Sequence, residues 1–324
     1  MPFAMRIHQT GGPEVMRWED VPVVPPAAGE ALVRHEAVGL NYVDTYYRSG
    51  LYPLPLPCGI GTEAAGVVEA IAAGVTEVKP GDRVTYAGGP LGAYSQLRCL
   101  PADRLIKLPD TIDSRTAAAM TLQGLTSAYL LRKTYRVEPG DTVLIHAAAG
   151  GVGLIACQWA KALGATVIGT VSNEAKAELA RQNGCDHIIF YSREDVAQRV
   201  RELTAGEGVA VVYDGVGKDT FAGSIDSLRV RGMMVSFGNA SGPVAPFSPL
   251  LLAQKGSLFF TRPGLAHYTA KRDELLALAA ELFAVVGSGK VKITVNQTYA
   301  LADVANAHRD LEARKTTGST ILIP

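Results

Sequence analysis

The residues from His146 to Gly153 carry the clearest chemical pattern in the chain. The segment reads His-Ala-Ala-Ala-Gly-Gly-Val-Gly and lies between a β-branched run and an apolar stretch. Gly150 and Gly153 occupy the second and third glycine positions of the dinucleotide fingerprint, and Ala148 occupies the first. Glycine lets a pyrophosphate approach the backbone at 150 and lets a helix pack against the sheet at 153. The pattern predicts a phosphate-binding turn at a helix N-terminus.

The residues after the next strand indicate which dinucleotide binds. Sites for NAD place an acidic residue about twenty positions downstream to hold the ribose 2′-hydroxyl. Here the strand ends at Val171, and Ser172 and Asn173 follow, neither of them acidic. Lys176 comes next in the first helical turn and supplies a positive charge. This arrangement favours the 2′-phosphate of NADPH, although Glu174 argues against it unless its side chain points to solvent.

The cysteines and histidines have no spacing typical of a metal site. The four cysteines show no CxxC pair, which fits a reducing compartment and small buried side chains better than a disulfide framework. The six histidines are expected to be surface or hydrogen-bonded core residues. These residues are Cys58, Cys99, Cys157, Cys185, His8, His35, His146, His187, His267 and His308.

Composition narrows the class of protein. Lys and Arg number 31, as do Asp and Glu, so the balanced charge makes nucleic-acid binding unexpected. The uncharged stretch 142–160 has the length of a membrane span, but its glycines and His146 favour a strand, a turn and a helix. The first residues have no signal-peptide pattern. We therefore expect a cytoplasmic protein without a membrane span.

The elements that must position the turn form two kinds of pattern. The first ~120 residues are β-rich, with strands expected at 31–38, 66–71 and 83–86. The apolar, proline-containing segment 51–57 is predicted to be a loop at a pocket wall. From about Gly124, strands alternate with helices at 152–163 and 174–183, which predicts a doubly wound parallel sheet. Its six strands are expected at 142–146, 166–171, 187–190, 209–214, 233–237 and 257–261.

The remainder of the chain is expected to return to the first domain, with helices at 272–286 and 301–313. The predicted organisation is therefore an α/β chain with three segments: 1–123 for a β-rich catalytic domain, 124–261 for a Rossmann domain, and 262–324 for the return to the catalytic domain.

Three stretches together resemble the medium-chain dehydrogenase/reductase superfamily, most closely its zinc-free NADPH:quinone oxidoreductases, the zeta-crystallin-like group. They are Asn41 to Tyr52, Gly59 to Gly66 and His146 to Gly153. The resemblance extends over the whole chain. It implies a GroES-like catalytic domain, a Rossmann domain that binds NADPH, and a homodimer formed through the Rossmann sheets.

The resemblance also implies a role for individual residues. Asn41, Tyr46, Tyr52 and Thr126 would line the nicotinamide end, the first three as catalytic residues. The remaining cofactor-binding residues would be Ala149, Gly150, Gly151, Val152, Gly153, Ser172, Asn173, Lys176, Tyr191, Phe237, Gly238, Ser241 and Arg314. Of these, Lys176, Tyr191 and Arg314 would surround the 2′-phosphate.

Zinc-dependent members of the superfamily have metal ligands where this sequence has Asn41, Thr62 and the neighbourhood of residues 122–124. No thiolate or imidazole stands there, so no metal is expected. Without a Lewis acid, an already electrophilic acceptor such as a quinone suits the reaction. Tyr46 or Tyr52 would donate a hydrogen bond or only position the rings. The alternative is reduction of an activated carbon–carbon double bond, as in enone or enoyl-thioester reductases.

Overall fold

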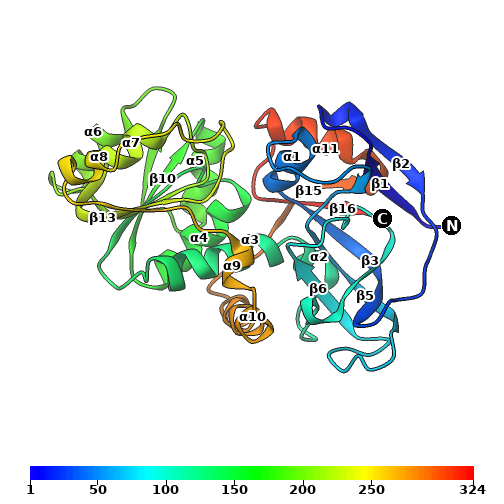
Figure 1. Ribbon diagram of the computed structural model, residues 1–324. Helices are drawn as coiled ribbons and strands as arrows, with labels where there is room; N and C mark the ends of the chain where they lie inside the picture. Colours follow the sequence, from blue (N-terminus) through cyan, green and yellow to red (C-terminus); the bar gives the residue numbers. More distant parts are fainter. The chain divides into compact units, whose positions relative to one another are not determined.

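The computed structural model describes all residues from Met1 to Pro324. The chain forms two compact units. The first contains Met1–Leu125, Tyr268–Gly287 and Ile293–Pro324, and the second contains Thr126–His267 and Ser288–Lys292. Both ends of the chain lie in the first unit (Figure 1). The chain therefore leaves the first unit, builds the second, and returns.

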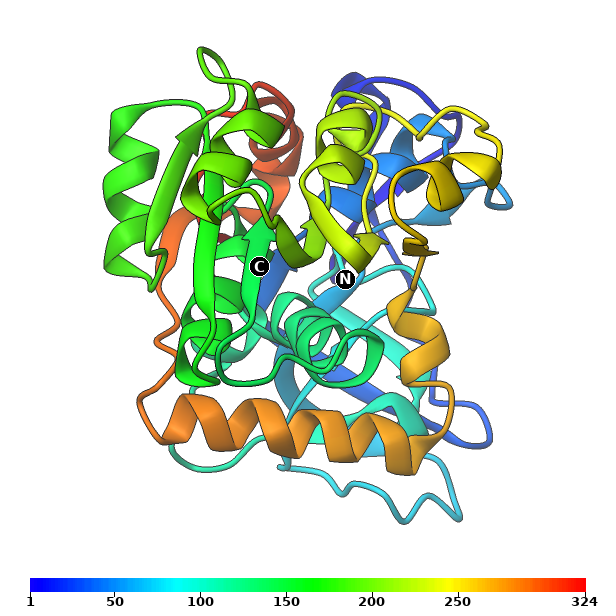
Figure 2. The same cartoon turned by 90° about the vertical axis from the view of Figure 1, so that its left-hand side faces the viewer.

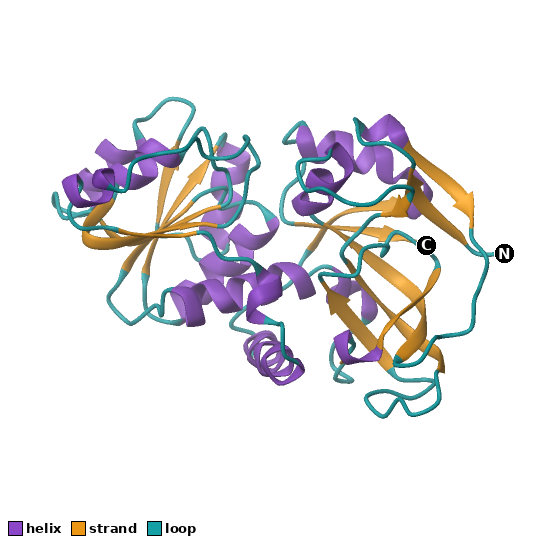
Figure 3. Cartoon of the chain, viewed as in Figure 1, coloured by secondary structure: helices purple, strands orange, loops and turns teal.

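The first unit is built on a seven-stranded sheet and a three-stranded sheet (Figure 3). In the larger sheet, β16 lies between β15 and β3, so a strand near the end of the chain pairs with one near its beginning. The strands of this unit are β1 (Phe3–Ile7), β2 (Met16–Asp20), β3 (Glu30–Leu40), β4 (Cys58–Gly59), β5 (Glu63–Ile71), β6 (Arg83–Ala87), β7 (Leu97–Pro101), β8 (Ile106–Lys107), β15 (Val295–Ala300) and β16 (Ser319–Ile323).

The first unit also contains helices, of which α10 is the longest (Figure 2). They are α1 (Tyr42–Ser49), α2 (Ser114–Ala118), α10 (Arg272–Gly287) and α11 (Val304–Glu312), with short 3-10 turns η1 (Pro13–Val15), η2 (Ala102–Arg104) and η4 (Leu301–Asp303). The chain passes to the second unit within α3 (Thr121–Tyr129), after Leu125, and α3 continues into the π-helical turn η3 (Leu130–Thr134).

The second unit contains a parallel six-stranded sheet in the order β11-β10-β9-β12-β13-β14. The chain starts at the centre, moves to one edge, returns and moves to the other, which is the doubly wound topology that the sequence predicts. Its elements are β9 (Thr142–Ile145), α4 (Gly151–Ala162), β10 (Thr166–Val171), α5 (Glu174–Gln182), β11 (His187–Phe190), α6 (Val196–Leu203), β12 (Val209–Asp214), α7 (Phe221–Asp226), β13 (Leu228–Ser236), α8 (Leu250–Gln254), β14 (Phe259–Thr261) and α9 (Leu265–Tyr268).

Most predicted elements of the second unit are confirmed, and the differences lie at their ends. β10, β11 and β12 have the expected bounds. β13 begins five residues before the expected start at Met233, and β14 begins at Phe259 rather than Ser257. Ser257 has a φ of 55°, a left-handed conformation that does not fit a strand.

Each unit has its own buried apolar core. In the second unit, residues such as Leu144, Ile168 and Val212 from the central strands pack beneath the helices. In the first unit, Val33, Val84 and Leu322 bring strands from both parts of the chain into one cluster. Among the helices, none has the length and apolarity together that crossing a bilayer would require.

Candidate active site

The turn after β9 has the backbone form that phosphate binding needs. Ala147 adopts a left-handed φ of 52°, and Gly150 is the N-cap of α4. A Cβ at Gly153 would overlap the carbonyl oxygen of Ala147 and lie 2.7 Å from that of Ala148, so a side chain there would displace the turn. The first N–H groups of α4, at Gly151 and beyond, lack partners within the helix. Backbone donors and a positive helix end therefore meet at one open turn.

His146 directly precedes this turn and is buried. Its Nδ1 lies 3.0 Å from Thr170 Oγ1 and its Nε2 lies 2.9 Å from Ser224 Oγ. Ser224 in turn donates to Asp214 Oδ2 over 2.8 Å. Burial lowers the pKa of His146, so the ring is a neutral link between the ends of β9, β10 and β12. The sequence-based interpretation of this histidine as a hydrogen-bonded core residue agrees with its position.

The residues after β10 form the capped start of α5. Asn173 caps α5, because its Oδ1 accepts a hydrogen bond of 3.0 Å from the Lys176 backbone N–H. Ser172 lies beside it, with its Oγ 3.4 Å from Asn173 Nδ2. Glu174 points away along the helix and pairs with Arg181 at 3.3 Å. The one acidic residue that argued against a 2′-phosphate is thus engaged elsewhere.

Tyr191 follows β11 and is 39% exposed. Arg193 lies two residues further on, and its guanidinium stacks over the Phe190 ring at 4.0 Å from the centroid. Arg314 belongs to the first unit, where it follows α11 in a left-handed conformation with a φ of 59°.

The loops after β12 and β13 are joined by hydrogen bonds and close backbone contacts. Ser241 donates its hydroxyl to the Val216 carbonyl over 2.9 Å, and its backbone N–H bonds the same carbonyl at 2.8 Å. A side chain at Gly238 would overlap the backbone of Gly215, and Phe237 bonds Asp214 through its backbone at 2.8 Å. These contacts give Ser241 a structural role within the loops. Thr126 lies buried in α3, at the start of the second unit.

A cluster of tyrosines forms the aromatic part of the site in the first unit. Tyr46 on α1 packs edge-on against Tyr52, with ring centroids 5.3 Å apart, and Tyr47 also packs edge-on against Tyr52, at 5.5 Å. Tyr42 lies 5.7 Å from Tyr46. Gly50 ends the helix in a left-handed conformation, so the chain turns and the Tyr52 N–H bonds the Tyr46 carbonyl at 3.1 Å. The two predicted tyrosines are therefore neighbours.

Asn41, at the N-cap of α1, lies beside two buried carboxyl groups. Its Nδ2 donates to Glu63 Oε2 over 2.7 Å, and its backbone N–H donates to Asp44 Oδ2 over 2.9 Å. Its Oδ1 accepts from Gln123 Nε2 at 3.3 Å, and Gln123 accepts from the Ser319 hydroxyl at 2.7 Å. Residues from four separate segments of the chain thus fix one amide.

Asp44 is the end of a second series of hydrogen bonds. It accepts from Thr62 Oγ1 at 2.8 Å and from the Tyr94 hydroxyl at 2.7 Å. Tyr94 lies 3.0 Å from His308 Nε2, and Arg48 lies 3.0 Å from His308 Nδ1. Because the Arg48 guanidinium can only donate, His308 is neutral and donates through Nε2 toward Tyr94. Burial lowers the pKa of His308 to about 3, consistent with this assignment.

The two carboxyl groups titrate unusually because they are withdrawn from water. Burial raises the pKa of Glu63 to about 8, against the opposing effect of its hydrogen bonds from Asn41 and Leu122. Burial likewise raises the pKa of Asp44 to about 6. Both residues fell within the quoted sequence stretches but were not assigned a role, since nothing in the sequence shows that they are buried.

The side chains at the positions of zinc ligands in related enzymes are bonded to these carboxyl groups, Asn41 to Glu63 and Thr62 to Asp44. In the structure, no group of three or more His, Cys, Asp or Glu side chains is arranged to hold a metal ion.

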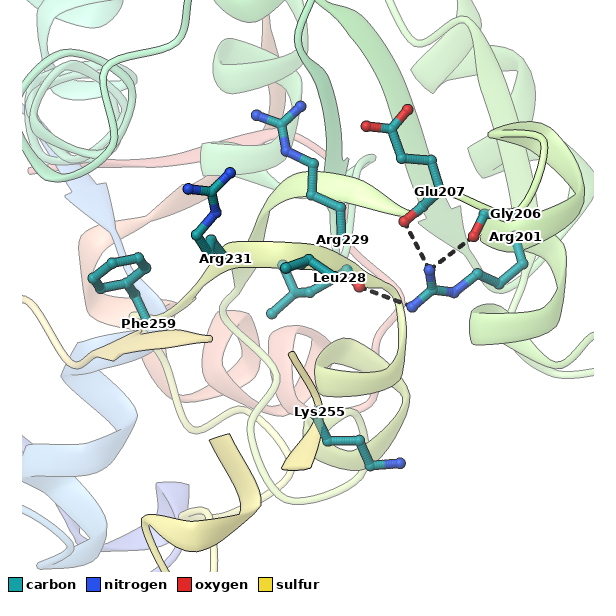
Figure 4. Close-up of a pocket in the computed structure, with 9 residues that line it drawn as sticks. Arg201, Gly206, Glu207, Leu228, Arg229, Arg231, Lys255 and Phe259 are labelled. Carbon is teal, nitrogen blue, oxygen red and sulfur yellow. Dashed lines mark hydrogen bonds between the residues drawn. The ribbon is translucent and has the colours of Figure 1, made fainter. Parts of the chain in front are cut away.

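A cavity of about 890 Å³ lies elsewhere on the second unit, beside β13 and β14. Figure 4 shows its cationic side chains Arg229, Arg231 and Lys255. Arg201 is held by backbone carbonyls, including those of Gly206 and Glu207 (Figure 4), and Lys255 pairs with Asp226 at 2.6 Å. None of the predicted site residues lines it.

Comparison with known proteins places this geometry in context. Two family models match the chain: the alcohol dehydrogenase GroES-like domain over residues 27–110 and the zinc-binding dehydrogenase family over residues 151–281. They confirm the predicted pairing of a GroES-like domain with a Rossmann domain.

Relatives of known name match over nearly the full length. The chain is 56% identical over 315 residues to a quinone oxidoreductase of Pseudomonas aeruginosa, with 97% of each chain covered. It is 48% identical over 332 residues to a 2-haloacrylate reductase of a Burkholderia species, covering 100% of this chain and 99% of that protein. The crystal structure of Escherichia coli quinone oxidoreductase complexed with NADPH is 50% identical, with a TM-score of 0.98 over 99% of this chain and 100% of that one.

Proposed function

This chain belongs to the quinone oxidoreductases of the medium-chain dehydrogenase/reductase superfamily, and from that premise we propose how its residues reduce a quinone. The enzyme uses NADPH to reduce quinones. The observation that carries this function is the identity of 50–56% to quinone oxidoreductases over essentially the whole chain. One quinone, one NADPH and one proton give one hydroquinone and one NADP⁺.

NADPH would be held at the turn between β9 and α4. The backbone of residues 150–153 would contact its pyrophosphate, with the N–H groups of residues 151–153 as donors, and Lys176, Tyr191 and Arg314 would bind its 2′-phosphate. The open turn, the overlap that excludes a side chain at Gly153, and the diversion of Glu174 to Arg181 support this assignment. Bound NADPH supplies the hydride.

The nicotinamide end would be lined by Asn41, Tyr46, Tyr52 and Thr126. We propose that no metal takes part, and that the residues act by placing a flat acceptor against the nicotinamide ring and excluding water. The edge-on packing of Tyr46 and Tyr52 supports a preformed aromatic wall. Hydride transfer needs the reacting atoms at roughly 3–3.5 Å, so positioning is the main contribution of these residues.

A second candidate acceptor is an activated carbon–carbon double bond, favoured by the 48% identity to a 2-haloacrylate reductase. A steady-state comparison of 1,4-benzoquinone, an ortho-quinone and 2-chloroacrylate, each with NADPH, separates the two. We expect the highest kcat/KM with a quinone. Negligible quinone turnover beside rapid 2-chloroacrylate reduction would reverse the assignment and leave the cofactor site intact.

We further propose that the catalytic domain comprises residues 1–123 and 262–324 and the Rossmann domain residues 124–261. We also propose that the protein is a cytoplasmic homodimer in which the second units of the two copies meet along β14. β14 is the outer strand of its sheet, so one of its edges is unpaired. Phe259 on that strand and Val230 beside it are 56% and 68% exposed, which an interface between two copies would cover. Sedimentation equilibrium measures the oligomeric state directly.

A further inference from the structure

The hydrogen bonds around Asn41 run in one direction. The Ser319 hydroxyl donates to Gln123 Oε1, Gln123 Nε2 donates to Asn41 Oδ1, and Asn41 Nδ2 donates to Glu63 Oε2. Every member of this series, which we call the amide chain, is buried. Turning both amides around would reverse every hydrogen bond in the amide chain, and this requires Ser319 to accept and Glu63 to donate. The direction of the hydrogen bonds is therefore set by whether Glu63 can only accept.

Glu63 is that group. Its Oε2 accepts from Asn41 at 2.7 Å, and its Oε1 accepts from the Leu122 backbone N–H at 2.7 Å. A backbone N–H can only donate, so Oε1 must accept. Above its pKa of about 8, Glu63 is ionised and its carboxylate accepts on both sides. The space for it comes from Gly39, because a Cβ there would overlap both the Glu63 carboxylate and the Ala118 carbonyl. The fold thus holds the Glu63 side chain next to Asn41, where it is an acceptor in its ionised form.

The direction of the amide chain decides what Asn41 presents to the rest of the site. A primary amide nitrogen has two hydrogens. One of them bonds Glu63, and the structure gives the other no acceptor. The Oδ1 atom is turned toward Gln123. Asn41 therefore has an N–H group to offer, and its proximity to the carboxylate polarises that group.

We propose that Asn41 Nδ2 donates a hydrogen bond to the acceptor oxygen that gains negative charge during hydride transfer, and that Glu63 and Gln123 are positioning residues that fix this orientation. The proposal rests on the proposed function, because it needs the acceptor to bind beside Asn41. This uncharged N–H group would stabilise the negative charge on the acceptor oxygen, as a Lewis acid does in metal-dependent enzymes. Its preferred ligand is a carbonyl conjugated in a ring or to a double bond.

The kinetic test compares Asn41→Leu, Glu63→Gln and Glu36→Gln with the wild-type enzyme, using NADPH and tetramethyl-1,4-benzoquinone at pH 8.5, above the pKa of Glu63. Loss of one oxyanion donor typically lowers kcat about 10²–10³-fold, which we expect for Asn41→Leu. Glu63→Gln should fall between it and the wild type, since a glutamine lets the amide chain reverse. Glu36 accepts from Ser114 in the same unit and serves as the matched control, with kcat/KM unchanged.

The second readout is spectroscopic and does not depend on turnover. In the NADP⁺ complex, 4-nitrophenolate mimics the charged acceptor oxygen, and a hydrogen bond to that oxygen shifts its absorption band to shorter wavelength. We expect this shift in the wild type and in Glu36→Gln, its loss in Asn41→Leu, and a smaller shift in Glu63→Gln. NADPH affinity, measured by fluorescence titration, should stay unchanged in all four proteins, which shows that the variants are folded.

An identical nitrophenolate band in the wild type and Asn41→Leu, or a kcat that survives Asn41→Leu, would overturn the proposal. If the wild-type enzyme reduced no quinone, the proposed function would fall instead. The nitrophenolate band would still report whether Asn41 donates, so the two failures are distinguishable.

Discussion

At the scale of single residues, cofactor preference should depend on Lys176. A charge-assisted hydrogen bond to the 2′-phosphate is worth about 1.5–3 kcal/mol, so Lys176→Ala should raise the KM for NADPH roughly ten- to a hundredfold. The KM for NADH should hardly change, because NADH lacks that phosphate. Lys161→Ala is a suitable control, since Lys161 pairs with Asp186 on the same unit. Equal losses with both cofactors would place Lys176 in another role.

The tyrosine hydroxyls should matter less than the tyrosine rings. Tyr46 and Tyr52 pack through their rings, so Tyr→Phe at either position keeps the aromatic wall. A positioned acid contributes about 10²–10⁴-fold, and we expect each Phe variant to lose less than this in kcat/KM for 1,4-benzoquinone. Tyr299→Phe, which removes a hydroxyl bonded to Asp310, provides the baseline. A thousandfold loss at one tyrosine would make it an obligate proton donor.

At the scale of elements, the start of α4 depends on Gly153. An alanine Cβ there would meet the backbone carbonyls of Ala147 and Ala148, which cannot move without shifting the helix or the turn. Gly153→Ala should weaken NADPH binding at least about tenfold and destabilise the unit by about 1–3 kcal/mol. At Gly287 an added Cβ meets nothing within 4 Å, so Gly287→Ala is the matched control. Unchanged NADPH affinity in Gly153→Ala would show that the turn accommodates a Cβ at this position and would contradict the prediction.

The elements also show what could be predicted from the sequence. The parallel sheet was predictable because its strands are short apolar runs with helices between them, as at Thr166–Val171. α1 was not, because five of its eight residues are aromatic or β-branched, and its start depends on Asp44 accepting the Asn41 N–H.

One part of the candidate site was likewise predictable from the sequence, and another was not. The turn at Gly150–Gly153 is local and was visible as a spacing of glycines. The amide chain joins Asn41, Glu63, Gln123 and Ser319, whose separations along the chain have no period that a sequence pattern could display. Only the pairing of β16 with β3 brings its last member into place.

At the scale of the whole molecule, stability should fall as pH rises toward 8. Burial raises the folded-state pKa of Asp44 to about 6 and that of Glu63 to about 8, from 3.8 and 4.5. The folded protein therefore binds these protons more tightly than the unfolded chain. Their contribution is complete below pH 4 and is lost as pH passes through the folded values, with a slope of about 1.4 kcal/mol per pH unit for each group.

Urea unfolding at pH 6, 7 and 8 measures this slope. Between pH 6 and 8 most of it should come from Glu63, so Glu63→Gln should flatten the curve and Glu36→Gln should not. A wild-type free energy of unfolding that stays level or rises over this interval would contradict the assignment.

Activity should also withstand removal of metal ions. The side chains at the relevant positions, Asn41 and Thr62, are hydrogen-bonded to carboxyl groups and include no thiolate or imidazole. Dialysis against EDTA should leave kcat for quinone reduction unchanged, with the metal content followed by elemental analysis. One zinc per chain in the active enzyme, and loss of turnover when it is stripped, would require a different account.

The position of β16 near the end of the chain affects the order in which the two units fold during synthesis. The second unit closes with residues 288–292, whereas the sheet of the first unit and its amide chain wait for Ser319. A nascent polypeptide on the ribosome thus completes its nucleotide-binding sheet seconds before the catalytic half can assemble. A chain truncated shortly before Ser319 would therefore bind NADPH but would not reduce a quinone.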